Sequence, residues 1–422
     1  MLSFIQQRFQ LSVMTLEMAT INGERIRHLQ IGEMSWLAQF ANFCINNEPC
    51  VLHESFTTDW PSRELWVRED GRPNLDYLRN QYGEGLVPVI TENKCDPDEI
   101  TFNKFCDYCE SVDVAGDSEP QYLKDWHFQR SYGINMYHVP AMLTSDWVNC
   151  ESWTNGDDNP FHGDYRFVYF GVKNTTRFHS DVMSSHSWSA NICGRKLWYL
   201  VPAGNENVFI KDGDPVKDIR PYKDLWPEAN LMVLVQKPGE IVFVPANWYH
   251  QVHNLEDTIS INHNSINASN VHLVYAFLRR RLMDVKEEIG HLSNLFTKEE
   301  MIEQEQVGTF ASTNSFSFND RAPPSNALQI VLGADARLNM PRLRCLLQMV
   351  VVDRSKGLMA TCYVCCHHSD PLDCMKNCSC LKQFATYCQC TKKNSVCCER
   401  FMQSFELSVA ISLLDKMTKD GY

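Results

Sequence analysis

The stretch GEIVFVPANWYHQVHN, residues 239–254, decides how the middle of this chain folds. It opens with β-branched and aromatic residues, turns at a Pro-Ala-Asn sequence, and continues into a second strand-like run that carries His250. Short runs of this kind recur between Tyr122 and Asn270, separated by clusters of Gly, Pro, Asn and Asp. Such a pattern is typical of an all-β barrel or sandwich, so we expect a β core in this region.

Helical patterns flank the β-rich region. The N-terminal part alternates amphipathic stretches with short strand-like runs, as in EMSWLAQFANFCINNEP followed by CVLH. Apolar residues at helical spacing follow Val271 and return in FMQSFELSVAISLLDKM, while residues 308–327 are rich in Ser, Asn and Pro and predict a linker. We therefore divide the chain into a mixed region (1–121), a β domain with its following helix (122–297), a linker with a partly ordered segment (298–345) and a C-terminal extension (346–422).

The charge of the chain limits the class of partner. Its formal net charge is −13 and its pI is near 5.5. Such a surface repels phosphate backbones, so we expect no nucleic-acid partner and favour a Lys- or Arg-bearing protein. Acidity that serves only solubility is the alternative. The sequence contains neither a signal-peptide apolar region nor an apolar run long enough to cross a membrane, which predicts a soluble, intracellular protein.

A metal site is predicted by FHSDV, residues 178–182, together with His250. Residues two apart in an extended strand point to the same face, so the His179 imidazole and the Asp181 carboxylate can converge on one ion. His250 can supply a third ligand from a neighbouring strand. Two histidines and one carboxylate leave three sites of an octahedron open, as in non-haem Fe(II) oxygenases. We predict an iron site made of these three residues.

Three other histidines compete for the third position: His186, His253 and His263. His253 lies three residues after His250, and this odd offset turns it to the opposite face of a strand. His263 is better suited to structural hydrogen bonding. An isolated His-x-Asp pair is often an ordinary surface or core feature, and here only its surroundings favour the metal site.

The ordered set of motifs resembles the jumonji-C family of double-stranded β-helix (cupin or jelly-roll) oxygenases, and within it the JmjC-domain-containing protein 4 group. Matching stretches run from Pro49 to Phe296 and include PCVLHESFTTDWPSRELWV, QYLKDWHF, DYRFVYFGV, FHSD and SWSANICGRKLW. The resemblance implies a mainly β fold with flanking helices, and Fe(II), 2-oxoglutarate and O2 as cofactor and co-substrates. For this group it implies hydroxylation of a lysine at its fourth carbon in the translation termination (class 1 release) factor. That substrate favours the cytoplasm, with the nucleus as the alternative.

The resemblance also assigns residues that grip 2-oxoglutarate. Lys196 matches the basic residue that pairs with the distal carboxylate of 2-oxoglutarate. Arg195 alternates to the other face of the strand, so one of the two must point inward. Thr176 matches a hydroxyl that supports the same carboxylate, although Thr175 has the same chemistry.

Three further positions follow from the same resemblance. Tyr122 matches a phenol near the distal carboxylate, with core packing as its alternative role. Asn262 matches a polar pocket residue on the last core strand. Ser189 is a weaker match to a pocket residue, because relatives often carry an Asn near this position.

Three other functions stay open on the motif alone. JmjC lysine demethylases use the same three ligands to hydroxylate an N-methyl group that is then lost. A non-catalytic JmjC scaffold is the second alternative, and the complete ligand set with Lys196 argues against it. A cupin-type metal protein with unrelated small-molecule chemistry would show no dependence on 2-oxoglutarate.

The C-terminal extension is dense in cysteine. Eleven of the 18 cysteines lie after residue 340, most of them in TCYVCCHHSDPLDCMKNCSCLKQFATYCQCTKKNSVCC, residues 361–398. This density of thiols suits Zn2+, which binds four S or N ligands. The cysteines are not spaced as the two ligand pairs of a known zinc finger, so reduced thiols in a poorly folded extension are the alternative. Cys106 and Cys109 also form a C-x-x-C, within a helical pattern that predicts core packing.

Overall fold

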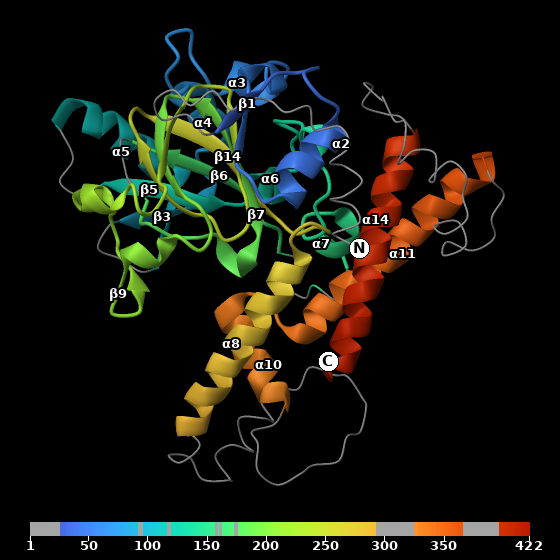
Figure 1. The fold of residues 1–422 in the computed structure, drawn as a ribbon. Helices are drawn as coiled ribbons and strands as arrows, with labels where there is room; N and C mark the ends of the chain where they lie inside the picture. The colour runs from blue at the N-terminus through green and yellow to red at the C-terminus, as the bar shows by residue number, and fades with distance from the viewer. Residues whose placement is uncertain are drawn as a thin grey trace.

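The computed structural model describes residues 26–91, 96–115, 120–156, 159, 163–172, 176–292, 325–365 and 396–422. These residues form a mixed α/β fold in which a β core carries helices on its flanks (Figure 1). The β core confirms the strand-rich region expected between residues 122 and 270. No helix in the described part of the chain combines the length and apolar character needed to span a membrane.

A nine-stranded sheet is the largest element. Its order is β1 (Arg27–Leu29), β2 (Cys50–Leu52), β12 (Ile241–Val244), β7 (His186–Cys193), β14 (Thr258–Ser265), β6 (Arg166–Gly171), β5 (Gln121–Trp126), β3 (Leu86–Thr91) and β4 (Asp98–Thr101). Only the β1–β2 pair is parallel. Strands from the N-terminal region thus extend this sheet at both of its ends, and the predicted boundary at residue 122 falls inside β5.

A three-stranded sheet faces part of the large one. Its order is β11 (Met232–Gln236), β8 (Lys196–Val201) and β13 (Tyr249–Asn254). A buried apolar cluster joins the two sheets, because alternate residues of each strand point inward: Trp198, Leu200 and Val252 come from the small sheet, and Val51, Val242 and Val244 from the large one. The two sheets share no strand among the described residues. A two-stranded ribbon, β9 (Ile210–Lys211) with β10 (Asp214–Pro215), completes the β structure.

Helices cover the other face and one end of the large sheet. The longer ones are α4 (Leu75–Tyr82), α5 (Phe102–Ala115), α8 (Val271–Leu292), α10 (Ser325–Ala336), α11 (Met340–Cys365) and α14 (Val396–Lys419). The shorter ones are α2 (Trp36–Gln39), the π-helical turn η2 (Phe40–Ile45), η3 (Glu54–Phe56), α3 (Pro61–Leu65), α6 (Phe128–Tyr132), η4 (Ala141–Leu143), α7 (Glu151–Thr154), η5 (Val182–Ser184), η6 (Glu206–Phe209) and η7 (Arg220–Leu225).

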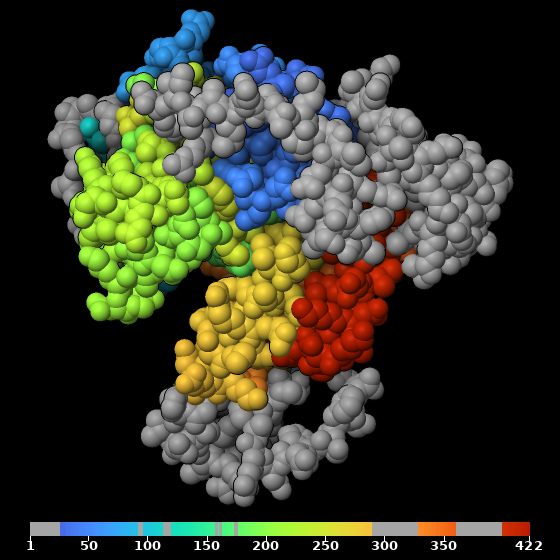
Figure 2. All heavy atoms as spheres, in the orientation of Figure 1, coloured from blue at the N-terminus to red at the C-terminus, as the bar shows by residue number. Residues whose placement is uncertain are grey.

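The C-terminal helices pack against the β core and not apart from it. Buried leucines of α11 and the apolar residues Phe405 and Leu413 of α14 belong to the same hydrophobic core as the large sheet. Helices α8 and α14 lie side by side on one surface (Figure 2), where Tyr275 donates a 2.6 Å hydrogen bond to Asp420.

The sequence predicted most of these elements. The helix expected before Pro49 is present as α2 and η2, and Cys106 and Cys109 are buried in α5 as predicted. The helix α10, which follows the expected linker, was not predicted. The cysteines proposed to bind zinc in residues 361–398 lie outside the residues whose side chains the structure describes.

Gly194 makes the turn between β7 and β8 and gives a testable consequence for stability. Its φ is +70°, and a Cβ placed there would lie 2.2 Å from the backbone oxygen of Asp257. Gly204 also has a positive φ, +93°, but open space around it. We expect Gly204→Ala to cost about 1–2 kcal/mol through backbone strain alone. Gly194→Ala should cost about 1–3 kcal/mol more because of the clash, as measured by urea unfolding. Equal losses for the two variants would contradict the steric argument.

Candidate metal centre

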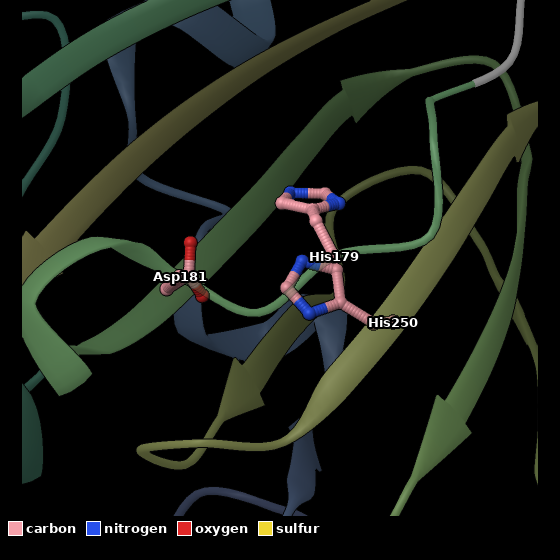
Figure 3. A group of neighbouring side chains, drawn as sticks. All are labelled: His179, Asp181 and His250. Atoms are coloured by element: carbon pink, nitrogen blue, oxygen red, sulfur yellow. The ribbon is translucent and has the colours of Figure 1, made fainter. Parts of the chain in front are cut away.

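His179, Asp181 and His250 come together on the inner side of the β core (Figure 3). Their potential ligand atoms all lie within 4.8 Å of one another. The two histidines are also backbone partners, since each amide donates to the other's carbonyl at 3.0 and 2.7 Å, and their ring centroids are 4.4 Å apart. His250 is buried, while the other two are half-buried and can be reached from solvent.

The segment around Asp181 differs from the expected strand. His179 forms only an isolated bridge with His250, and Asp181 is extended (φ −67°, ψ 151°) just before a turn. In that turn Met183 and Ser184 both have a left-handed backbone, with φ of 59° and 54°. Such residues cost on the order of 1–3 kcal/mol each and persist only where their surroundings hold them. The extended backbone still places His179 and Asp181 on one side, as predicted, without a continuous strand.

Hydrogen bonds fix which nitrogen of each imidazole can bind a metal. His179 Nδ1 lies 2.7 Å from the carbonyl oxygen of Arg177, and His250 Nδ1 lies 3.2 Å from that of Trp248. A carbonyl only accepts, so Nδ1 of each ring carries the proton and Nε2 presents a lone pair. This arrangement is the usual one for histidines that hold a metal ion.

The Asp181 carboxylate is oriented by two donors. Ser187 donates to its Oδ2 at 2.6 Å, and Asn264 donates to its Oδ1 at 3.0 Å. Burial acts to raise the pKa of Asp181, but the His250 and His179 imidazoles and these two hydrogen bonds outweigh it and hold the pKa below its usual value. The carboxylate is therefore ionised at neutral pH.

His179 is uncharged at neutral pH. Burial, followed by the nearby His250, lowers the pKa of His179 to about 4. A neutral imidazole and an ionised carboxylate are the forms that bind a metal, since protonated ligands must first lose their protons. The chemistry of this donor set therefore fits a divalent transition metal.

The competing histidines have other contacts. His253 points to the opposite face of β13, as predicted, and packs edge-on against Tyr199 with ring centroids 5.5 Å apart. His263 stacks on Trp188 and makes a 2.7 Å hydrogen bond with the Tyr137 hydroxyl, which confirms its structural role.

Lys196 is buried within the β core. Only 3% of it is exposed, and its Nζ donates to Ser260 Oγ at 2.7 Å. Arg195 points outward to Glu256, so the predicted alternation of the two basic residues is confirmed. No carboxylate of the described residues pairs with Lys196, and burial lowers its pKa to about 7. A buried cationic group without an anionic partner is costly, and it suits a ligand that brings a carboxylate.

Two of the other predicted pocket residues, Asn262 and Ser189, lie on β14 and β7, close to Ser260, the partner of Lys196. Asn262 donates to Ser260 Oγ at 3.1 Å, and Ser189 lies opposite Asn262 in the β7–β14 pairing. The buried Ser189 hydroxyl has no partner among the described residues. These side chains lie on adjacent strands and leave polar groups available to a ligand.

Tyr122 and Thr176 have clear local roles. Tyr122 is buried, packs on Tyr169 with ring centroids 5.8 Å apart, and has a raised pKa because of burial. The Thr176 hydroxyl accepts a 2.9 Å hydrogen bond from the backbone N–H of Val252, so it takes part in pairing with β13. Thr175, the alternative to Thr176, lies outside the described residues.

Three supporting residues were missed by the sequence reasoning: Ser187, Asn264 and Ser260. A signal for two of them was present in TISINHNS, where Ser260, Asn262 and Asn264 alternate with Ile259 and other core residues. This alternation places one polar face of β14 toward the metal centre. Ser187 had a similar signal in SWSANIC, where Ser187, Ser189 and Asn191 alternate with the core residues Trp188, Ala190 and Ile192.

Comparison with known proteins identifies the family to which the chain is similar. A model of the "JmjC domain, hydroxylase" matches residues 167–265, which span β6 to β14. The 2-oxoglutarate and iron-dependent oxygenase JMJD4 of Danio rerio is 41% identical over 277 residues, covering 61% of this chain and 64% of that protein. Its Homo sapiens counterpart is 39% identical over 278 residues, covering 61% and 66%. The arginine-specific demethylase JMJ20 of Arabidopsis thaliana is 33% identical over 327 residues, covering 71% of this chain and 67% of that protein.

This chain belongs to the JmjC domain family. The JmjC match contains His179, Asp181 and His250 as well as Lys196 and the polar face of β14. It ends before α8, so the C-terminal helices lie outside it. The chain spans a little under two thirds of the length of the JMJD4 oxygenases that it matches.

Proposed function

We propose that this JmjC protein is an Fe(II)- and 2-oxoglutarate-dependent dioxygenase that hydroxylates a lysine side chain of a protein. The observation that carries the proposal is that two sites lie on the neighbouring strands β13 and β8 of the small sheet. A two-histidine, one-carboxylate group presents both Nε2 lone pairs, and a buried lysine without an acidic partner lies on the adjacent strand β8. Relatives named as 2-oxoglutarate and iron-dependent oxygenases support it.

Each group has residues suited to hold it. His179, Asp181 and His250 would bind Fe(II), and Lys196 would pair with the distal carboxylate of 2-oxoglutarate. Tyr122, Thr176, Asn262 and Ser189 would surround that carboxylate: Tyr122, Asn262 and Ser189 from β5, β14 and β7, and Thr176 from the segment beside β13. We infer that the two facing sheets are the walls of a double-stranded β-helix. Bound iron and 2-oxoglutarate would supply the oxidising chemistry that inserts an oxygen atom into a substrate C–H bond.

The chain itself positions these groups and excludes water from one side of them. The Nδ1 protons of His179 and His250 stay on backbone carbonyls, which holds both rings in the metal-binding tautomer. Ser187 and Asn264 fix the Asp181 carboxylate. The apolar cluster between the sheets includes Trp198, whose ring centroid lies 5.8 Å from that of His250, so the cluster excludes water from that side of the metal centre.

For the substrate we propose the translation release factor, in the cytoplasm. The proposal rests on the resemblance to the group of lysyl hydroxylases and on the charge of the chain. A net charge of −13 favours a substrate with basic side chains and disfavours nucleic acid.

Demethylation is the second candidate function. It is favoured by the match over 327 residues to a protein named as an arginine-specific demethylase. Hydroxylation of an N-methyl group releases formaldehyde, whereas hydroxylation of a lysine carbon leaves a stable product. Peptides with and without N-methyl groups therefore separate the two reactions.

The test is succinate formation by the purified full chain with Fe(II), 2-oxoglutarate and ascorbate, with and without release factor. We expect turnover stimulated by the release factor, lost in His179→Ala, and one lysine that gains an oxygen atom by mass spectrometry. Formaldehyde release from methylated peptides alone would favour demethylation. Failure of the wild-type chain to bind iron would leave only a scaffold role.

We expect the affinity for 2-oxoglutarate to fall about tenfold for each pH unit above about 7. Burial lowers the pKa of Lys196 to about 7, so above that pH the free protein lacks the positive charge that the ligand carboxylate needs. Calorimetry with Mn(II) in place of iron measures this affinity without turnover. Lys196→Arg stays protonated throughout and should remove the pH dependence, even if it binds more weakly. Parallel pH profiles for the two proteins would contradict the assignment of Lys196.

A further inference from the structure

A carboxylate from the C-terminal helix α14 is inserted into the β domain. Glu406 is only 3% exposed and accepts hydrogen bonds from the Ser145 hydroxyl and, at 3.3 Å, from Trp147 Nε1. Arg354 of α11 pairs with the other carboxylate oxygen. Ser145 and Trp147 lie in the segment before α7, and α7 itself lies beside α11 and α14 in Figure 1. A buried carboxylate needs such partners, so this contact fixes α14 against the β domain.

From Ser145 a chain of hydrogen bonds continues toward the metal centre. The Ser145 carbonyl accepts from Asn267 Nδ2 at 3.0 Å, and Asn267 Oδ1 accepts from the Ser269 hydroxyl at 2.6 Å. The Ser269 hydroxyl donates its only proton to Asn267. His186 Nε2 must therefore be the donor in its 2.9 Å contact with Ser269 Oγ. His186 Nδ1 then accepts from the backbone N–H of Ala246 at 2.9 Å. Every donor in the chain has one acceptor.

A second branch reaches the turn after Asp181. Asn270 Oδ1 accepts from the backbone N–H of Asn267 at 2.8 Å. Asn270 Nδ2 donates to the carbonyls of Ser265, at 3.1 Å, and Ser184, at 3.4 Å. Ser184 is one of the two left-handed residues of the turn. Ala246 lies in the Pro-Ala-Asn turn just before β13 and His250, so the two branches together contact both turns that adjoin metal ligands.

The burial of this network leaves it few alternatives. His186 and Asn270 are 1% and 0% exposed, and Asn267 and Ser269 are 3% and 4% exposed. A buried polar group that loses its partner costs free energy that water cannot restore, so a fully satisfied network holds one arrangement. Burial also lowers the pKa of His186 to about 3, which keeps the ring neutral and its hydrogen bonds unchanged across physiological pH.

We propose that Glu406 is a positioning residue for the metal centre. Helix α14 holds the turns of Asp181 and His250 in their metal-binding geometry through Ser145, Asn267, Ser269 and His186. The proposal rests on the proposed function in one respect, that the three ligands bind a divalent metal. Glu406, Asn267 and Ser269 all lie outside the matched JmjC range of 167–265.

The test is Mn(II) binding by the full chain, followed by electron paramagnetic resonance. In Glu406→Ala we expect the Kd for Mn(II) to rise about tenfold, the lower end of the effect of changes outside the ligand shell, with an altered spectrum of the bound ion. Glu406→Gln keeps an acceptor oxygen for Ser145 and Trp147 and should restore the wild-type Kd. Ser269→Ala breaks the chain at a residue outside α14, beyond Asn267, and should raise the Kd as Glu406→Ala does.

Arg354→Met is the matched control. It removes the ion pair between α11 and α14 but leaves the contact from Glu406 to Ser145, so it should lower the unfolding temperature without changing the Kd. Glu406→Ala and Ser269→Ala with the wild-type Kd would overturn the proposal and leave α14 a purely structural role. Should Glu406→Ala fail to fold, Ser269→Ala decides by itself. A wild-type chain that does not bind Mn(II) would instead remove the proposed function, and this inference with it.

Discussion

Replacing His250 with alanine should abolish metal binding and succinate formation, while replacing His253 with alanine should preserve both. The two residues lie on the same strand, β13, but on opposite faces. His250 faces His179 with its Nε2 lone pair unprotonated, whereas His253 packs on Tyr199 on the other face of β13. Changes outside the ligand shell already cost about 10–100-fold in metal affinity, so loss of a ligand should cost more than about 100-fold.

This pair of variants controls for the general effect of losing a buried imidazole. Both should be measured by Mn(II) titration and by succinate formation, together with thermal unfolding to show that each is folded. We expect the His253 variant to lose some stability, because the His253 ring is buried in the wild-type protein. Loss of the metal in the His253 variant with retention in the His250 variant would mean that the face of β13 has been assigned incorrectly.

Lys196→Met should have two opposite effects. It should weaken 2-oxoglutarate binding by about 30-fold or more, since loss of one partner of a buried charge pair costs about 2–5 kcal/mol. It should also stabilise the ligand-free protein by about 1–4 kcal/mol, because a buried ammonium without an anionic partner opposes folding. The pKa of Lys196 is lowered to about 7, so this cost is complete below pH 7 and fades as the pH rises toward the usual lysine value.

Arg195→Met is the corresponding control. Arg195 is the sequence neighbour of Lys196, points to solvent and pairs with Glu256 at the surface, where ion pairs contribute little. It should change neither the calorimetric affinity for 2-oxoglutarate nor the urea midpoint at pH 6 appreciably. If Lys196→Met destabilised the ligand-free protein, the lysine would have a protein partner, and its assignment to 2-oxoglutarate would be wrong.

The metal ligands could be predicted from the sequence because their geometry is local. His179 and Asp181 are two residues apart in an extended segment, and strand alternation separates His250 from His253 and Lys196 from Arg195. The left-handed turn at Met183 and Ser184 was missed, because neither is a residue type that marks positive φ. The strand expected around Asp181 therefore proved to be a single bridge.

Long-range polar contacts cannot be predicted from local sequence patterns. In the sequence, Glu406 occupies an ordinary polar position of a predicted amphipathic helix. Its partner Ser145 is 261 residues away along the chain. Nothing in either local pattern specifies such a pairing, because it depends on how α14 docks. The alternation in SWSANIC predicts a polar face that includes Ser187, but not that Ser187 donates to Asp181, which lies just before the left-handed turn.

The place of β2 in the large sheet has a consequence for synthesis of the chain. β2 pairs with β12, with Leu52 opposite Ile241, so a fully buried early strand must wait for a partner made about 190 residues later. At ribosomal rates of about 5–20 residues per second, that delay is roughly 10–40 seconds. During this time the apolar edge formed by Cys50, Val51 and Leu52 is open to non-native pairing. Folding dominated by such distant contacts is slow, so the nascent chain should depend on chaperones until β12 has left the ribosome.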